Sequence, residues 1–254
     1  MRSLKEELEI NFTAFNHELK RRLNETFDAL ELNNQLYIGS YERLSSFEAW
    51  RAYVIEQKVS SSSLSFFLEA QNDALLSHAF AKIGSWRAAL QSLRSVIENT
   101  LFCLYYMDHP VEYQLWEAGK NQLPISDYVK YISKHPKFYQ IDDNITGAAL
   151  LKREYSILSK AVHASATSFR MTGVLQHFPT LMLPDILKLN QWLTRERHTI
   201  QIVNQILITI FFEELQGAKL RNLRKSISFT IPKNLFEQIR NQFNIRLFEL
   251  PDIN

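Results

Sequence analysis

Few residues in this chain can interrupt a helix. Six glycines and seven prolines stand among 254 residues, which is about 5% of the chain where an average protein carries about 12%. Sandwiches and barrels of β-strands need many tight turns, and glycine and proline are prominent among the residues that make them. The composition therefore argues against an all-β fold and favours a helical one.

Apolar residues repeat at the helical period over the first thirty residues. The stripe advances by about 3.7 residues per step, the spacing of one helix face, and consists of Leu4, Leu8, Phe12, Phe15, Leu19, Leu23, Phe27 and Leu30. Charged residues occupy most of the remaining surface of this helix. Such a narrow stripe can pack on the chain's own bundle or on a partner helix. Of these two, we expect the first.

Further helices follow, separated by a few turn signals. A loop is predicted between Asn33 and Ser40, and a long helix is predicted from about residue 60 to Met107 with a bend near Gly84. Shorter helices are predicted over residues 111–119, 126–134 and 146–164. The segment from Pro184 to Leu215 is predicted to be the longest helix, and its apolar second half is typical of the middle of a bundle.

The C-terminal residues change to a strand-like pattern. Ile227, Phe229 and Ile231 alternate with polar residues, and residues 245–250 form a second β-like run. The helix expected between them suits a crossover between parallel strands. The predicted fold class is therefore an all-α helical bundle with a small C-terminal βαβ appendage. We divide the chain into N-terminal amphipathic helices over 1–58, a bundle over 59–216, and a basic stretch with the appendage over 217–254.

Charge and motif content exclude several classes of function. The net charge is +2, so no global field indicates nucleic-acid or membrane binding. A single cysteine, Cys103, excludes an internal disulfide framework and multi-cysteine metal sites. Glycine-based nucleotide-binding and hydrolase motifs are absent, and the longest charge-free apolar run, 199–212, is too short to cross a membrane. We therefore expect a cytoplasmic protein without a cofactor, a bound metal or membrane contact.

Two helices carry polar rows on otherwise apolar faces. Arg94 and Glu98 lie one turn apart on the first, and Tyr155, Ser159 and His163 share one face of the second. Because a buried charge must be paired, we expect the two rows to converge away from solvent. The candidate catalytic residues are therefore Arg94, Glu98, Tyr155 and His163, and a purely structural network of the same side chains is the interpretation we favour.

These rows carry a family resemblance. With Arg94 and Glu98 on one helix and the Tyr155–Ser159–His163 row on a later one, residues 60–215 resemble the helical HEPN superfamily. The similarity is greatest to branches of unknown function found in bacterial abortive-infection and phage-defence genes. The resemblance implies a helical fold. In active members it also implies a metal-independent ribonuclease shared across a dimer, in which a histidine takes the 2′-hydroxyl proton and an arginine stabilises phosphate charge.

The chain departs from the ribonuclease pattern of that superfamily, in which four to six residues, the first of them polar, stand between the Arg and the His. The arginine nearest before His163 is Arg153, with nine residues between them. Arg170 and His177 have six residues between them, but Met171 stands where the pattern has a polar residue. We therefore expect the helical fold without the reaction.

A basic stretch precedes the predicted appendage. Lys219, Arg221, Arg224 and Lys225 lie close together and are candidates for nucleic-acid binding. The alternative is a solvated helix end with no ligand, and we favour that alternative.

The leading functional hypothesis is a non-catalytic helical interaction subunit of a bacterial anti-phage defence assembly. Protein partners, or a second copy in a homodimer, would dock on the N-terminal helix, on the C-terminal appendage or on both. One alternative is a metal-independent ribonuclease toxin that uses His163 with Arg94 or Arg170. The other is a nucleic-acid-binding adaptor that uses the basic stretch around Arg221.

Overall fold

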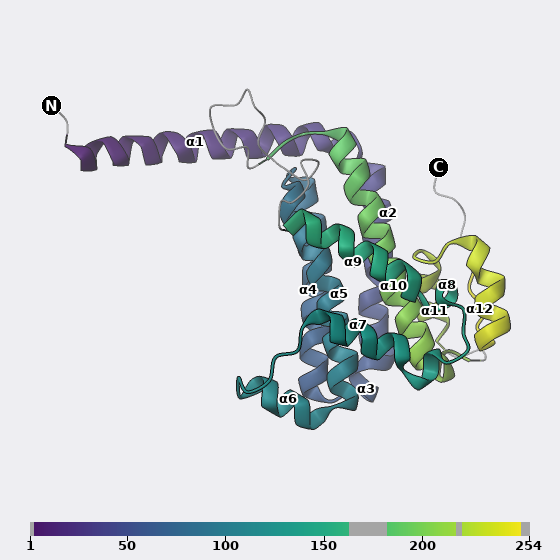
Figure 1. Cartoon of the computed structure of the whole chain (residues 1–254). Coiled ribbons are helices and arrows are strands. Elements are labelled where there is room, and N and C mark those ends of the chain that lie inside the picture. The colour runs from purple at the N-terminus through teal and green to yellow at the C-terminus, as the bar shows by residue number, and fades with distance from the viewer. Residues whose placement is uncertain (1–2, 163–181, 217–219, 250–254) are drawn as a thin grey trace.

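The computed structural model describes residues 3–162, 182–216 and 220–249, and within these ranges the chain is helical with no β-strand (Figure 1). The α-helices are α1 Leu4–Glu31, α2 Asn34–Trp50, α3 Glu56–Lys58, α4 Ser61–Lys82, α5 Trp86–Asp108, α6 Pro110–Glu117, α7 Ile125–Lys134, α8 Asp143–Thr146, α9 Ala148–Val162, α10 Ile186–Leu215, α11 Arg221–Ser228 and α12 Phe236–Phe243. A π-helical turn, Arg51–Ile55, joins α2 to α3, and 3-10 turns span Pro136–Phe138 and Lys233–Leu235. The prediction of an all-α protein is confirmed.

Helix α10 is the central helix of the bundle. It packs against α2, α5 and α9, and every residue from Ile202 to Phe211 is buried. Two tryptophans are fully buried in this core, Trp50 on α2 and Trp192 on α10 itself. Each indole donates a hydrogen bond: Trp50 Nε1 to Asn204 Oδ1 (2.8 Å) and Trp192 Nε1 to Ser77 Oγ (3.0 Å). Helix α10 spans 30 residues, with a kink at Phe211, whose backbone is not helical (φ −116°, ψ 23°).

Helices α4 and α5 form an antiparallel hairpin that turns at Gly84. The backbone of Gly84 has a φ of +67°, a left-handed conformation that glycine adopts without steric cost. Its carbonyl accepts a hydrogen bond from the Leu183 amide (3.1 Å), and Trp86 Nε1 donates to the Leu183 carbonyl (2.8 Å). The prediction of one long helix bent near Gly84 is therefore wrong, because the chain reverses there.

The predicted loop between Asn33 and Ser40 is also wrong. Only a short turn at Leu32 and Asn33 separates α1 from α2, and Gly39 and Ser40 lie inside α2. Ser40 is fully buried and donates to a carboxylate on α10. A serine in that helix therefore serves a buried polar contact.

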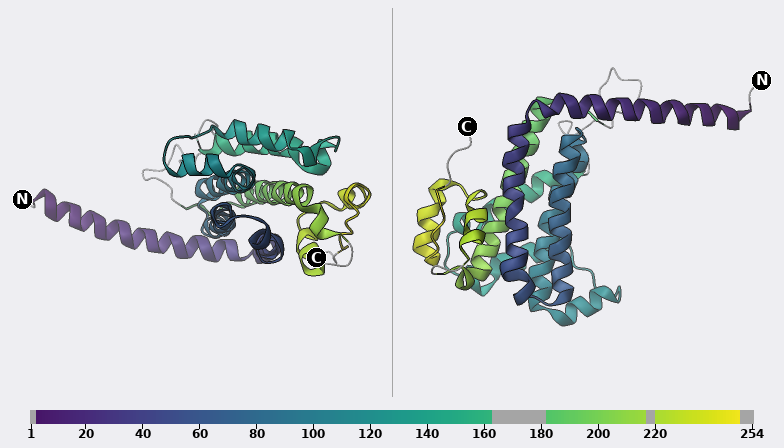
Figure 2. Two further views of the ribbon diagram at one scale, coloured as in Figure 1. Left: turned by 90° about the horizontal axis from the view of Figure 1, so that it is seen from below. Right: turned by 180° about the vertical axis from the view of Figure 1, so that it is seen from behind.

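Helix α1 extends away from the bundle along most of its length in all three views of Figures 1 and 2. It begins with a capping box, in which Ser3 and Glu6 exchange hydrogen bonds. Leu4 is 71% exposed and Phe12 is 65% exposed. Only Thr26 and Leu30 of this helix are buried. The prediction that the stripe packs on the chain's own bundle is wrong except at the C-terminal end of α1.

The predicted βαβ appendage is not found among the described residues. Leu223 and Ile227 are one turn apart in α11 and are both buried, so the apparent alternation around Ile227 reflects a helix followed by a turn. Residues 245–249 belong to no helix or strand. Their backbone is held instead by α11 side chains: Phe248 N donates to Ser228 Oγ (2.9 Å) and Arg224 donates to the carbonyl of Arg246 (3.3 Å).

No helix in the described ranges combines the length and the apolar character that a membrane crossing requires.

Candidate functional site

The predicted polar rows meet in a three-residue cluster between α5 and α9. Tyr155 Oη donates to Glu98 Oε1 (2.7 Å) and accepts from the Arg94 guanidinium (3.0 and 3.2 Å), and Arg94 Nη2 lies 2.9 Å from Glu98 Oε1. Burial raises the pKa of the Tyr155 hydroxyl, and its bond to Glu98 raises it further. Each polar group in this cluster therefore has its partner within the cluster.

The cluster lies closer to solvent than the sequence predicts. The side chains of Arg94 and Glu98 are 22% and 23% exposed. The charge of Arg94 is balanced by Glu98, so the guanidinium is not held ready for a phosphate. The remaining candidates His163, Arg170 and His177 lie outside the described residues, so their place relative to this cluster remains a prediction.

A more deeply buried network, not predicted from the sequence, joins α2, α4 and α10. Glu196 is 1% exposed, and its carboxylate accepts from Arg43 Nε (2.9 Å) and Nη2 (2.5 Å) and from Ser40 Oγ (3.1 Å). Ser40 Oγ also lies 3.0 Å from His78 Nδ1. The signal for this network is Glu196 itself, because a carboxylate inside an apolar helix requires a buried partner.

The histidine of this network predicts a pH dependence of stability. Burial, with smaller contributions from Lys82 and Arg43, lowers the pKa of His78 from 6.5 to about 4. The unfolded chain therefore binds a proton between pH 6.5 and 4 that the native chain does not, so acidification through this range destabilises the fold. Because His78 is only partly buried, we expect a loss of about 1 to 2 kcal/mol between pH 7 and pH 5.

Urea unfolding of the wild type and of His78→Gln at the two pH values checks this expectation. The variant should lose less stability than the wild type on acidification. An equal loss in both proteins would assign the pH dependence to other groups.

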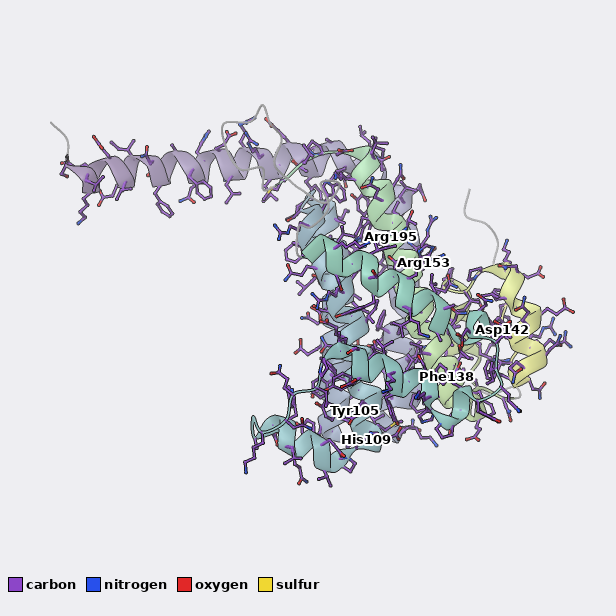
Figure 3. The ribbon with its side chains drawn as sticks, in the orientation of Figure 1. Tyr105, His109, Phe138, Asp142, Arg153 and Arg195 are labelled. Carbon is purple, nitrogen blue, oxygen red and sulfur yellow. The ribbon has the colours of Figure 1, made fainter. Side chains whose placement is uncertain are left out.

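A third cluster joins α9 and α10, where Figure 3 labels Arg153 and Arg195 on these neighbouring helices. Glu154 is fully buried, and its Oε2 lies 2.9 Å from Arg195 Nη1 and 3.0 Å from His198 Nδ1. Its second oxygen, Oε1, has no partner among the described residues. His198 also lines a cavity of about 350 Å³ together with Arg43 and Arg197. A carboxylate that orients an imidazole at a cavity is an arrangement that can support proton transfer.

The sequence contains the pattern for this third cluster, but its meaning depends on the fold. Arg195 and His198 are three residues apart and therefore share a helix face, and Glu154 precedes Tyr155 directly. That α9 packs against α10, however, follows only from the tertiary structure. Neither residue type nor spacing indicates which of the two adjacent residues, Glu154 or Tyr155, turns toward α10.

The basic stretch divides into residues with different surroundings. Arg221 and Arg224 line a pocket of about 1190 Å³ at the C-terminal part of the chain, whereas Lys225 is exposed and does not line it. Lys219 lies outside the described residues. The pocket lies between α11, α12 and residues 246–249. Further basic side chains line it that were not selected from the sequence.

No group of three or more metal-ligand side chains gathers within the described ranges. Comparison with protein-family models, with curated proteins and with solved structures finds no match to this chain. The resemblance to the HEPN superfamily therefore rests on the sequence features given above.

Proposed function

We propose that this chain is a non-catalytic helical interaction subunit and that α1 is the element through which it assembles. The observation that carries the proposal is the exposed apolar stripe of α1. Leu4, Leu8, Phe12 and Phe15 are all more than half exposed along one face of a helix that extends from the bundle. An exposed apolar face of this kind marks an interaction site.

The partner that this stripe fits best is α1 of a second copy in the antiparallel direction. The apolar spacing from Leu4 to Leu23 is 4, 4, 3, 4 and 4 residues, which reads the same in both directions. Two antiparallel copies can therefore align every apolar residue with an apolar residue of the other copy. In that alignment Leu4 faces Leu23, Leu8 faces Leu19 and Phe12 faces Phe15. This gives a two-fold symmetric contact, as closed dimers require.

The charges of α1 favour the same alignment. Residues 5–9 carry three glutamates and one lysine, and residues 18–22 carry three cations and one glutamate. The antiparallel alignment brings the acidic segment of one copy onto the basic segment of the other. A parallel alignment would instead bring like charges together, which disfavours it.

The wider assembly follows from the resemblance to phage-defence members of the HEPN superfamily. We propose that the paired subunits belong to a bacterial anti-phage defence assembly. The self-contained Arg94–Glu98–Tyr155 cluster supports a non-catalytic role, because its polar groups already satisfy one another. Cleavage of RNA by the purified chain in EDTA would contradict this part of the proposal and favour the ribonuclease alternative.

Sedimentation equilibrium of the full chain tests the pairing of α1. We expect a dimer, and we expect the double variant Phe12→Glu with Phe15→Glu to weaken it at least about 100-fold, because four charges would enter an apolar contact. The double variant Thr13→Glu with Asn24→Glu adds the same charge on the other faces of α1 and should remain dimeric. At a protein concentration low enough for the wild type to be monomeric, both variants should keep its melting temperature, since these side chains are exposed in the single chain.

Cysteine cross-linking tests the direction of the pairing. The native Cys103 is fully buried, so introduced cysteines dominate the reaction. Leu8→Cys combined with Leu19→Cys should form disulfide-linked dimers, whereas Leu8→Cys alone should not. Efficient cross-linking of Leu8→Cys alone would indicate a parallel pair, and a monomeric wild type at high protein concentration would contradict self-association through α1.

A further inference from the structure

A cavity in the C-terminal part of the chain is lined by residues other than those of the three polar clusters described above. It holds about 1190 Å³, more than a typical small-ligand site. It is lined by residues from α11, from α12, from the turn Lys233–Leu235 and from residues 246–249. They include the cations Arg221, Arg224, Lys233, Arg240 and Arg246.

Positive charge is in excess in this pocket. The five cations share the lining with two carboxylates, Glu237 and Glu249. Within the described residues, none of the four arginines of the pocket forms an ion pair with a carboxylate, whereas Arg21, Arg43, Arg51 and Arg94 elsewhere all do. The pocket therefore concentrates guanidinium groups that no carboxylate of the described residues pairs with.

Arg224 is the strongest sign of a missing anion. This residue is only 7% exposed, and its Nε has no hydrogen-bond partner among the described residues. Burial lowers the pKa of its guanidinium, and the nearby charges of Arg221 and Arg246 lower it further. A buried cation is expected to have a counter-charge, and among the described residues Arg224 forms no ion pair: its contacts there are a backbone carbonyl and the Phe248 ring.

The guanidinium groups are also held in place. Arg224 Nη1 donates to the carbonyl of Arg246 (3.3 Å), and the guanidinium carbons of Arg221 and Arg224 lie 5.8 and 5.4 Å from the ring centroid of Phe248. The amide of Phe248 is in turn bonded to Ser228 on α11. Contacts of this kind fix arginine side chains before a ligand arrives and lower the entropy cost of binding.

We propose that this pocket binds a ligand that carries two or more phosphate groups. Arginine presents a planar fork of donors that matches phosphate oxygens. A ligand with several phosphates therefore suits a cavity with several arginines better than a ligand with a single carboxylate does. A free nucleotide and the backbone of single-stranded nucleic acid both supply this chemistry. The inference is independent of the pairing of α1.

Two probes on the full chain test the proposal and distinguish the sources. One is a fluorescently labelled ten-nucleotide oligouridylate followed by anisotropy, and the other is ATP followed by calorimetry, both in low salt without magnesium. We expect at least one probe to bind, and the double variant Arg221→Gln with Arg240→Gln to weaken that binding at least tenfold. These two residues are exposed, so the substitutions spare the core.

The matched control is Lys225→Gln with Lys130→Gln, which removes the same charge from exposed positions that do not line the pocket. It should change the affinity less than twofold. Binding of the oligonucleotide alone would identify a nucleic-acid backbone as the source, and binding of ATP alone would identify a small nucleotide. Failure of both probes to bind below 1 mM, or equal losses in the arginine and lysine variants, would overturn the proposal.

Discussion

Replacement of Glu196 by alanine is expected to lower the free energy of unfolding by about 3 to 5 kcal/mol, because it leaves the buried Arg43 guanidinium without its counter-charge. Arg43 is 8% exposed, and the Glu196 carboxylate accepts three hydrogen bonds from its guanidinium. Ser40 loses an acceptor in the same variant. Urea unfolding followed by circular dichroism measures the loss.

The double variant Arg43→Leu with Glu196→Leu distinguishes two causes of the loss in Glu196→Ala: an unpaired buried charge, or the loss of a favourable ion pair. Removing both charges should restore most of the stability, to within about 1 to 2 kcal/mol of the wild type, since apolar residues often replace buried pairs at little cost. A loss below about 1 kcal/mol in Glu196→Ala would show that water reaches Arg43.

Replacement of Gly84 by alanine is expected to cost roughly 2 to 4 kcal/mol, from backbone strain and from overlap together. A Cβ atom at this position would lie 2.6 Å from the carbonyl oxygen of Leu183 and 2.8 Å from Thr26 Cγ2. The turn between α4 and α5, the segment that leads into α10 and the base of α1 meet there. Thermal and urea unfolding of the variant measure the cost.

Gly119→Ala is the matched control for this substitution. Gly119 has a φ of +68°, nearly the value at Gly84, but nothing lies within 4 Å of an added Cβ. The control should therefore show the backbone strain alone, about 1 kcal/mol. If the two variants lose the same stability, the close approach at Gly84 relaxes without cost.

The helices of this chain could be predicted because their apolar periods are long and nearly uninterrupted. The clearest case is α10, whose second half is apolar on nearly every face and is buried as expected. The apparent strand around Ile227 shows the limit of short patterns, since Leu223 and Ile227 also fit one face of a helix. The sequence around Leu247 alternates like a strand, but strands require a partner, which the described residues do not supply.

The sites were predictable only where both partners lie in obvious polar rows. Arg94, Glu98 and Tyr155 could be selected together because each interrupts an apolar helix face. Glu196 interrupts α10 in the same way, but the sequence does not say that Arg43 on α2 faces it. Likewise, Arg221 and Lys225 are equivalent as basic residues in the sequence, and only the packing of α11 turns one toward the pocket and the other to solvent.

The reach of α1 determines how far apart two paired subunits would stand. At about 1.5 Å per residue, the antiparallel alignment separates the two bundle-proximal ends of α1 by about 50 Å along the helix axis. The dimer would then be a rod with one bundle at each end and would be bivalent for any ligand of the C-terminal pockets. A flexible polymer long enough to span both ends would bind far more tightly than a short one of the same chemistry, because its second attachment is intramolecular.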